Sequence, residues 1–172
     1  MTHVKQGKFS DLLLRDTCDA EYGINVFETG PLTIVDSREI GFSDAGIYLG
    51  GITDTGGGAV RVVRNASKRN NRGIVVEDSQ GGRIEVVSNR FIANKLTGEG
   101  DPAGVSLQNA DRVLLEDNDA SNNGRYGIRL DVNSAHNRLI GNVAHGNPGG
   151  NFHDEGTGNC GARNHPNPFP PC

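Results

Sequence analysis

Short stretches in which apolar and polar residues alternate recur along the chain and predict many short β-strands. Two apolar residues flank one residue at Val60 and Val62, and again at Ile84 and Val86. A period of two is typical of a strand with one buried face. A second kind of strand starts with glycine followed by an apolar-x-apolar triplet, and it occurs after Gly23, Gly46, Gly73, Gly104 and Gly127.

Asparagines follow the first kind of strand at a fixed distance and define a repeat. Asn65, Asn89, Asn118 and Asn142 are 24, 29 and 24 residues apart, and each is followed five residues later by another Asn. A unit of this length with two or three short strands cannot bury its apolar face alone, so copies must stack. Propeller blades and sandwiches need longer strands, and a leucine-rich repeat has a different signature. We therefore predict an all-β fold, a parallel solenoid of six to seven coils.

The repeated asparagines are best explained as a structural ladder. An Asn at a bend tolerates positive φ, bonds backbone groups and can bond the Asn in the next coil. We therefore interpret Asn65, Asn89, Asn118 and Asn142 as a structural ladder rather than as ligands. Asn65 also begins a glycosylation sequon, but its ladder position weakens that interpretation.

Composition alone would permit disorder, and the repeat removes that interpretation. The 172 residues include 25 Gly and 18 Asn, with 34% hydrophobic residues and a formal charge of −4. A thin solenoid needs few large apolar residues, because each coil buries only a few. The mild, evenly spread acidic balance argues against a nucleic-acid partner, and no apolar stretch approaches the roughly 18 residues of a membrane span.

The pattern G-I-x-L … V-x-V-x-x-N-x4-N, over residues 12–155, resembles the right-handed parallel β-helix proteins. These share their architecture with pectate lyases, polygalacturonases, alginate epimerases and periplasmic copper-site maturation factors. The resemblance implies a right-handed solenoid, a secreted or periplasmic location, and function on an outward sheet face. The tail from Gly156 to Cys172 also resembles the C-terminal closure of secreted bacterial members.

The chain is expected to form one domain, residues 1–172, in which the Pro-rich segment 156–172 caps the last coil. Spacing and context favour a disulfide between Cys160 and Cys172 over free thiols. Cys18 is left over and is read as a small buried hydrophobe. No cap precedes the first coil, so either the chain is a piece of a longer β-helix or a homodimer forms through the open N-terminal end.

Candidate chemistry lies on the outward positions of the Gly-led strands. The position two after Gly carries Tyr48, Ser106 and Arg129, and the position four after Gly carries Glu77, Gln108 and Asp131. His153 or Asp154 continues this stripe, depending on register. Insertions in solenoids often wall a binding face, and the segment 96–102 contributes Asp101.

Strand spacing sets carboxylates on adjacent and alternate coils about 5 and 10 Å apart, which suits glycosidase chemistry. A uronate lyase or epimerase would instead need a cation, a base and an acid. Arg129 could be the cation, His153 or Tyr48 the base or acid, and Asp131 with Asp154 an acid pair or a Ca²⁺ site. The predicted catalytic residues are therefore Tyr48, Glu77, Arg129, Asp131, His153 and Asp154, and the predicted substrate-binding residues are Gln108, Ser106 and Asp101.

The leading hypothesis is a secreted β-helix protein that binds or processes an acidic polysaccharide, as a lyase, epimerase or hydrolase. A non-catalytic interaction module of a larger surface protein is one alternative, and a biosynthetic isomerase or cyclase is another. The sequence does not decide whether the protein is an enzyme. The histidines are dispersed, so no structural metal site is expected, and Ca²⁺ is the one cofactor considered.

Overall fold

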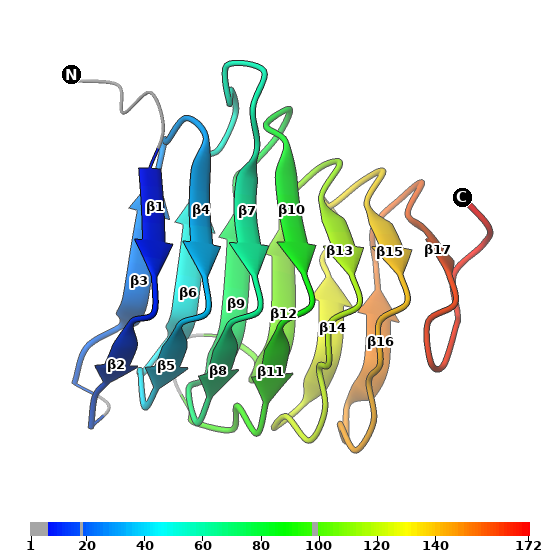
Figure 1. The fold of residues 1–172 in the computed structure, drawn as a ribbon. Coiled ribbons are helices and arrows are strands. Elements are labelled where there is room, and N and C mark those ends of the chain that lie inside the picture. Colours follow the sequence, from blue (N-terminus) through cyan, green and yellow to red (C-terminus); the bar gives the residue numbers. More distant parts are fainter. Residues whose placement is uncertain (1–6, 18, 98–99) are drawn as a thin grey trace.

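The computed structural model describes residues 7–17, 19–97 and 100–172, and in this part the chain winds as a solenoid of about six turns (Figure 1). Neighbouring strands come from successive coils, and every pairing is parallel. A seven-stranded sheet, a four-stranded sheet and a six-stranded sheet form its three faces. The expected right-handed parallel β-helix is confirmed, at the lower end of the predicted coil number.

The strands of each sheet follow one another along the solenoid axis. The seven-stranded sheet contains β1 (Gly7–Ser10), β4 (Leu32–Val35), β7 (Val60–Val63), β10 (Ile84–Val87), β13 (Leu114–Glu116), β15 (Arg138–Ile140) and β17 (Cys160–Ala162). The four-stranded sheet contains β2 (Leu13–Arg15), β5 (Arg38–Ile40), β8 (Ala66–Lys68) and β11 (Arg90–Ile92). The six-stranded sheet contains β3 (Tyr22–Phe27), β6 (Ala45–Gly50), β9 (Arg72–Glu77), β12 (Ala103–Gln108), β14 (Tyr126–Leu130) and β16 (Gly150–Asp154).

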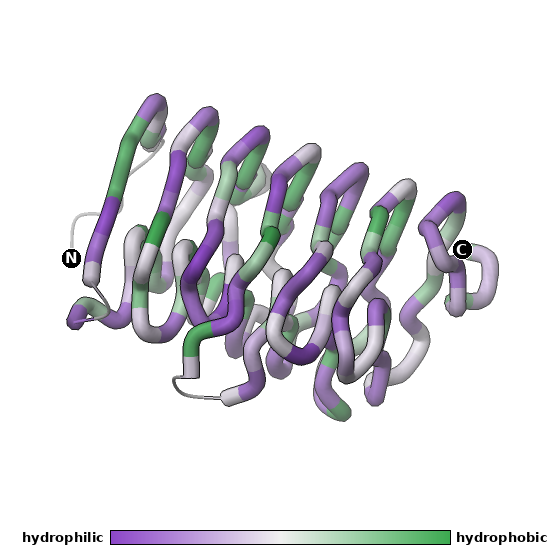
Figure 2. The backbone as a smooth tube through the Cα atoms, turned by 90° about the horizontal axis from the view of Figure 1, so that it is seen from below, coloured by the Kyte–Doolittle hydropathy of each residue, from purple (hydrophilic) through white to green (hydrophobic). Residues whose placement is uncertain are grey.

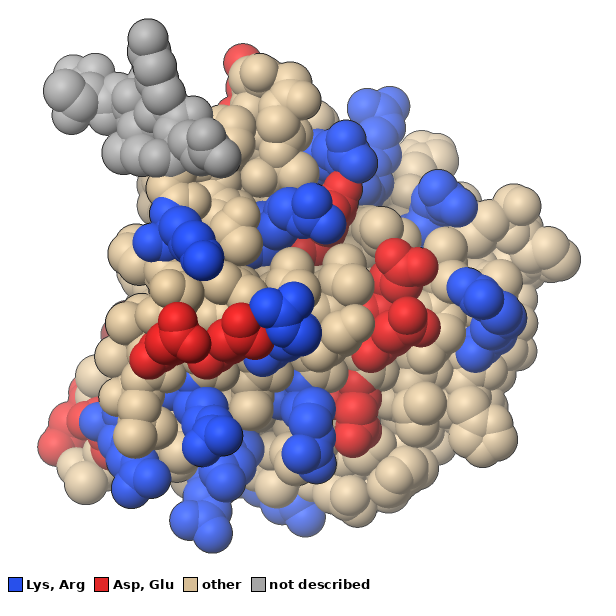
Figure 3. Space-filling model, in the orientation of Figure 1, with Lys and Arg blue, Asp and Glu red and all other residues tan. Residues whose placement is uncertain are grey.

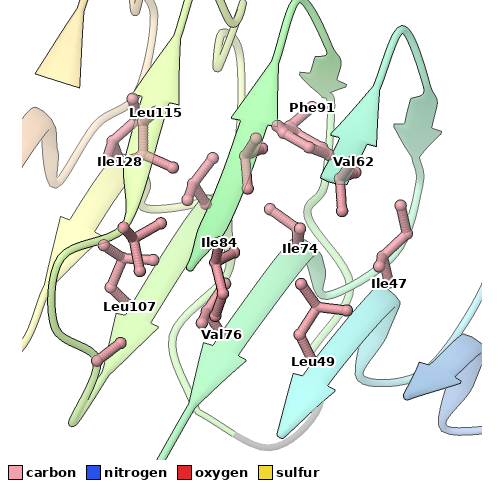
Figure 4. Close-up of a cluster of buried hydrophobic side chains, with 14 of the residues drawn as sticks. Ile47, Leu49, Val62, Ile74, Val76, Ile84, Phe91, Leu107, Leu115 and Ile128 are labelled. Atoms are coloured by element: carbon pink, nitrogen blue, oxygen red, sulfur yellow. The ribbon is translucent and has the colours of Figure 1, made fainter. Parts of the chain in front are cut away.

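The apolar residues of the repeat fill the interior between the sheets. Ile47, Ile74, Val105 and Ile128 are fully buried and follow one another in register through the six-stranded sheet. Figure 4 shows the side chains of Ile47, Ile74 and Ile128 pointing toward those of the opposite sheet. Figure 2 shows the coils stacked side by side, with apolar segments recurring at similar places in successive coils. Within the described residues, no helix is long and apolar enough to cross a membrane.

The predicted asparagine ladder joins the coils at the turn between the seven-stranded and four-stranded sheets. Asn118 Oδ1 accepts from the backbone N–H of Asn89 at 3.0 Å and from its Nδ2 at 2.9 Å. Asn118 Nδ2 in turn donates to Val86 O at 2.8 Å and to Asn142 Oδ1 at 3.0 Å. Each amide therefore satisfies buried backbone groups in its neighbours, which confirms the structural role.

Two further ladders run parallel to the first. The second Asn of each repeat forms one, in which the backbone N–H of Asn94 donates to Asn123 Oδ1 at 3.0 Å. Asn137 and Asn159 form the other, in which Asn137 N–H donates to Asn159 Oδ1 at 2.9 Å. The sequence pattern assigned Asn137 only to a strand flank, because earlier coils hold apolar residues such as Val113 at this position.

In β3, β6, β9, β12 and β14 the second residue is a glycine that lies where a side chain has no room. A Cβ at Gly104 would come within 2.7 Å of Asn123 Nδ2 and 2.8 Å of Gly127 O. The ladder of amides therefore requires glycine here.

The C-terminal segment closes the last coil. Cys160 and Cys172 form the predicted disulfide. Phe169 is buried and packs edge-on against Phe152, with ring centroids 5.6 Å apart. Residues 160–162 of the capping segment add strand β17 to the seven-stranded sheet. Cys18 and the N-terminal residues 1–6 lie outside the described residues.

One carboxyl group lies inside the solenoid without a partner. Glu39 on β5 points inward and is fully buried. Neither of its carboxyl oxygens bonds to another residue in the described part of the chain. Burial disfavours the charged form and raises the pKa of Glu39 to about 8.

We expect the substitution Asn118→Ala to lower the free energy of unfolding by about 3 kcal/mol, since each buried polar group left unpaired costs about 1–3 kcal/mol. Chemical denaturation monitored by circular dichroism measures this. Asn133→Ala is the matched control, because Asn133 is exposed and lies outside the ladders. Equal losses in the two variants would contradict the ladder's role.

We expect the free energy of unfolding to fall as the pH rises from about 4.5 to about 8. In this window Glu39 ionises in the unfolded chain but stays protonated in the folded one, so each pH unit costs up to about 1.4 kcal/mol. Denaturation of Glu39→Gln should lack this contribution, whereas exposed Glu28→Gln should keep it. Parallel pH profiles for wild type and Glu39→Gln would show that burial does not shift this pKa.

Candidate functional site

The outward row predicted on the six-stranded sheet is present. The position two after Gly aligns Tyr48 with Val75, Ser106, Arg129 and then His153. Val75 and Ser106 are nevertheless buried, so they lie beneath other side chains. Only the two ends of this row, Tyr48 on one side and Arg129 with His153 on the other, are partly exposed.

The second outward row differs from the prediction at its C-terminal end. Glu77 aligns with Gln108 as expected. His153 instead pairs with Arg129 in the first row, and Asp154 pairs with Leu130. The expectation that His153 or Asp154 follows Asp131 is therefore wrong in register, because Asn151, and not Gly149 or Gly150, takes the place of the strand glycine in this coil. Continuing the register places Glu155 beside Asp131.

Tyr48 and Glu77 form the centre of a hydrogen-bond network. Tyr48 Oη donates to Glu77 Oε2 at 2.7 Å. In the orientation that satisfies its neighbours, the Gln108 amide donates to Glu77 Oε1 at 3.1 Å and accepts from Arg72 and from Ser106 Oγ. Burial and the neighbouring Glu77 carboxylate raise the pKa of Tyr48 above its usual value.

A buried ion pair adjoins this network. Arg72 Nε donates to Asp44 Oδ1 at 2.9 Å, and both side chains are largely buried. Burial, followed by the Asp44 carboxylate, raises the pKa of Tyr22 to about 12. These three residues were not predicted. Tyr22 and Arg72 each stand directly before the glycine of their strand. The pairing between strands skips those glycines. The inward–outward alternation counted from the glycine therefore does not extend back to Tyr22 and Arg72.

Arg129 lies between two carboxylates without a close bond to either. Its guanidinium nitrogens are 3.7 Å from Asp101 Oδ2 and 3.5 Å from Glu155 Oε2. Its Nε is buried and has no hydrogen-bond partner in the described structure. The guanidinium lies over the Tyr126 ring at 5.7 Å, and His153 stacks on the same ring at 4.6 Å.

Asp131 and Asp154 are engaged by their own turns. Asp131 Oδ1 accepts from Ser134 Oγ at 2.7 Å and from the backbone of Asn109 at 3.0 Å. Asp154 Oδ1 accepts from Asn159 Nδ2 at 2.8 Å and from Gly156 N–H at 3.0 Å. Each carboxylate therefore holds a turn in place, and the two lie in different rows.

A polar hollow of about 300 Å³ connects these groups. Four of the predicted residues line it, namely Glu77, Gln108, Arg129 and Asp131, together with Tyr22, Asp44, Arg72 and Gly100. Tyr48 and Ser106 bond to lining residues, and Asp101 and His153 lie next to Arg129 or its neighbours.

The two predicted carboxylates of the hollow, Glu77 and Asp131, lie at the upper limit of the separation in an inverting glycosidase, and both already accept hydrogen bonds. Glu77 and Asp131 lie on β9 and the end of β14, with β12 between them, which sets them about 10 Å apart by strand spacing. Inverting enzymes hold their carboxyls about 6.5–9.5 Å apart, and retaining enzymes hold them closer. The arrangement is suited to hydrogen-bonding a hydroxyl-rich ligand and pairing one acidic group with Arg129.

The comparison with protein families gives one match over most of the chain. The family model described as periplasmic copper-binding protein (NosD) matches residues 11–165. The resemblance to β-helix repeat proteins and the expected secreted or periplasmic location are thereby confirmed. No curated protein and no solved structure matches the chain.

Copper in proteins prefers thiolate, thioether and imidazole ligands. Among the described residues, no three His, Cys, Asp or Glu side chains converge on one point. Cys160 and Cys172 are joined to each other, and His153 stacks on Tyr126. The described part of the chain does not fit a copper site.

We expect the substitution Glu77→Gln to lower the pKa of Tyr48 toward its usual value, because it removes the negative charge that accepts the Tyr48 hydroxyl. An NMR titration of labelled tyrosines measures the change. Glu85→Gln, on the seven-stranded sheet, is the control and should leave the Tyr48 titration unchanged. An unaltered titration in Glu77→Gln would contradict the contact.

Proposed function

Because the chain belongs to the periplasmic copper-binding protein (NosD) family, we propose a function outside the cytoplasm: the polar hollow binds an acidic saccharide. The ligand's carboxylate pairs with Arg129, and its hydroxyls bond to the carboxylate and amide groups of Glu77 and Gln108. Acidic polysaccharides and their fragments are the ligand class that this chemistry fits.

The proposal rests on one observation, which is that the Arg129 guanidinium is incompletely hydrogen-bonded. Its ion pairs with Glu155 and Asp101 are long, at 3.5 and 3.7 Å, and its buried Nε has no hydrogen-bond partner among the described groups. A buried donor without a partner costs free energy. A ligand carboxylate would satisfy this guanidinium in the two-pronged geometry that arginine favours.

Binding is favoured over turnover by the other groups in the hollow. Glu77 already accepts from Tyr48 and Gln108, and Asp131 holds its own turn. The raised pKa values of Tyr22 and Tyr48 suit neutral hydroxyls that form hydrogen bonds, rather than a base that removes a proton. A lyase, an epimerase and an isomerase remain outcomes of the test, visible as product formation.

We expect short oligogalacturonate or oligomannuronate to bind in isothermal titration calorimetry, and Arg129→Gln to weaken binding about 10- to 100-fold. That range corresponds to the roughly 1.5–3 kcal/mol of a charged hydrogen bond. Arg138→Gln, on the seven-stranded sheet, is the matched control and should bind as wild type does.

Two results would overturn the proposal. One is no binding of any acidic oligosaccharide by the folded protein. The other is equal binding of a neutral oligosaccharide of the same length, which would remove Arg129 as the recognition group. Chromatography of the incubated mixtures detects cleaved or epimerised products. Such products would show that the protein is an enzyme and not only a binding protein.

A further inference from the structure

A groove lies along the outward face of the four-stranded sheet, away from the polar hollow. Its middle strand residues, such as Glu39 and Phe91, point inward and are buried. The residues on either side of them point outward and form two rows, which line a groove of about 340 Å³. The first row is Leu13, Arg38, Ala66 and Arg90, and the second is Arg15, Ile40, Lys68 and Ile92.

Each of the four coils places one cation in this groove. Arg15 and Lys68 lie in the second row, and Arg38 and Arg90 lie in the first, so the cations alternate between rows. All four are exposed. Figure 3 shows Lys and Arg side chains gathered over β2, β5, β8 and β11.

These cations have no carboxylate partner within the described residues. Other surface arginines do, since Arg64 in the adjoining turn is paired with Asp36 at 2.7 Å and Arg61 with Glu85 at 3.2 Å. The ion pairs of the described structure include none of the four groove cations. The groove therefore presents four positive charges, staggered between its two rows, that form no ion pair among the described residues.

Charge spacing identifies the chemistry of the occupant. Parallel strands are about 4.8 Å apart, so the groove offers one cation about every 4.8 Å over about 14 Å. One glycosidically linked uronate residue advances a chain by a similar length and carries one carboxylate. Duplex nucleic acid is much denser, with one charge per about 1.7 Å of axis.

The residues between the cations fit the same occupant. Leu13, Ile40, Ala66 and Ile92 occupy the alternate positions, and Leu13 is 57% exposed. Apolar side chains can cover the C–H faces of sugar rings while the cations reach the carboxylates. Beyond Arg90 the first row continues with Asp119, so the favourable charge ends after the fourth coil.

We propose that the four-stranded sheet binds a linear acidic polysaccharide lying along the solenoid axis, with about one uronate carboxylate for each of Arg15, Arg38, Lys68 and Arg90. This surface is separate from the hollow and does not depend on Arg129. The two sites can therefore hold different parts of one polymer or act alone.

The test uses the full chain and polygalacturonate of graded length, measured by calorimetry at several salt concentrations. The double variant Arg38→Gln/Arg90→Gln should bind long polymer at least tenfold more weakly and reduce the salt slope by about two, one for each cation removed. The matched control Arg138→Gln/Arg163→Gln removes the same charge from elsewhere and should bind as wild type does. Circular dichroism confirms that both variants are folded.

Two comparisons separate this proposal from the function of the hollow. Arg129→Gln should keep its affinity for long polymer through the groove, whereas the groove variant should keep its affinity for a short oligouronate. If the groove variant and the control variant lose the same affinity for long polymer, the loss reflects only the overall charge of the protein, and the proposal is overturned. Absence of polymer binding by Arg129→Gln, or tighter binding of single-stranded DNA than of polygalacturonate, would also overturn it.

Discussion

The parallel register of the stacked coils is the constraint on which the rest of the structure depends. Backbone pairing alone permits a coil to slip along its neighbour, but the buried amides do not, because each one fits only one neighbour. Asn118 accepts from Asn89 and donates to Asn142, and the same pattern recurs along the axis. The ladders therefore fix both the distance and the rotation between coils, and the thin apolar interior follows from that alignment.

A fixed register converts outward residues into straight rows about 4.8 Å apart. On the six-stranded sheet the rows are interrupted by buried Val75 and Ser106, and a polar hollow forms around Arg129. On the four-stranded sheet the rows are regular and carry unpaired cations. The same repeat thus forms the polar hollow on the six-stranded sheet and the groove on the four-stranded sheet.

The sequence predicted the features that are local or strictly periodic, namely the strands, the asparagine ladder, the disulfide and the row from Tyr48 to Arg129. It missed the Arg72 and Asp44 ion pair, because the strand register skips the glycine beside Arg72. It misplaced Asp154, because Asn151 stands at the glycine position of the last coil, and counting from Gly149 or Gly150 therefore gives the wrong register. The sequence pattern did not indicate the groove cations Arg15, Arg38, Lys68 and Arg90, because they alternate between two positions of the repeat.

We propose that function lies on outward rows aligned by the coil register, and a crystal structure of the protein with a bound acidic tetrasaccharide is the sharpest test. We expect sugar carboxylates beside Arg129 or along Arg15, Arg38, Lys68 and Arg90, with the coils in the register described. A saccharide bound to the seven-stranded sheet, or coils displaced from that register, would contradict it.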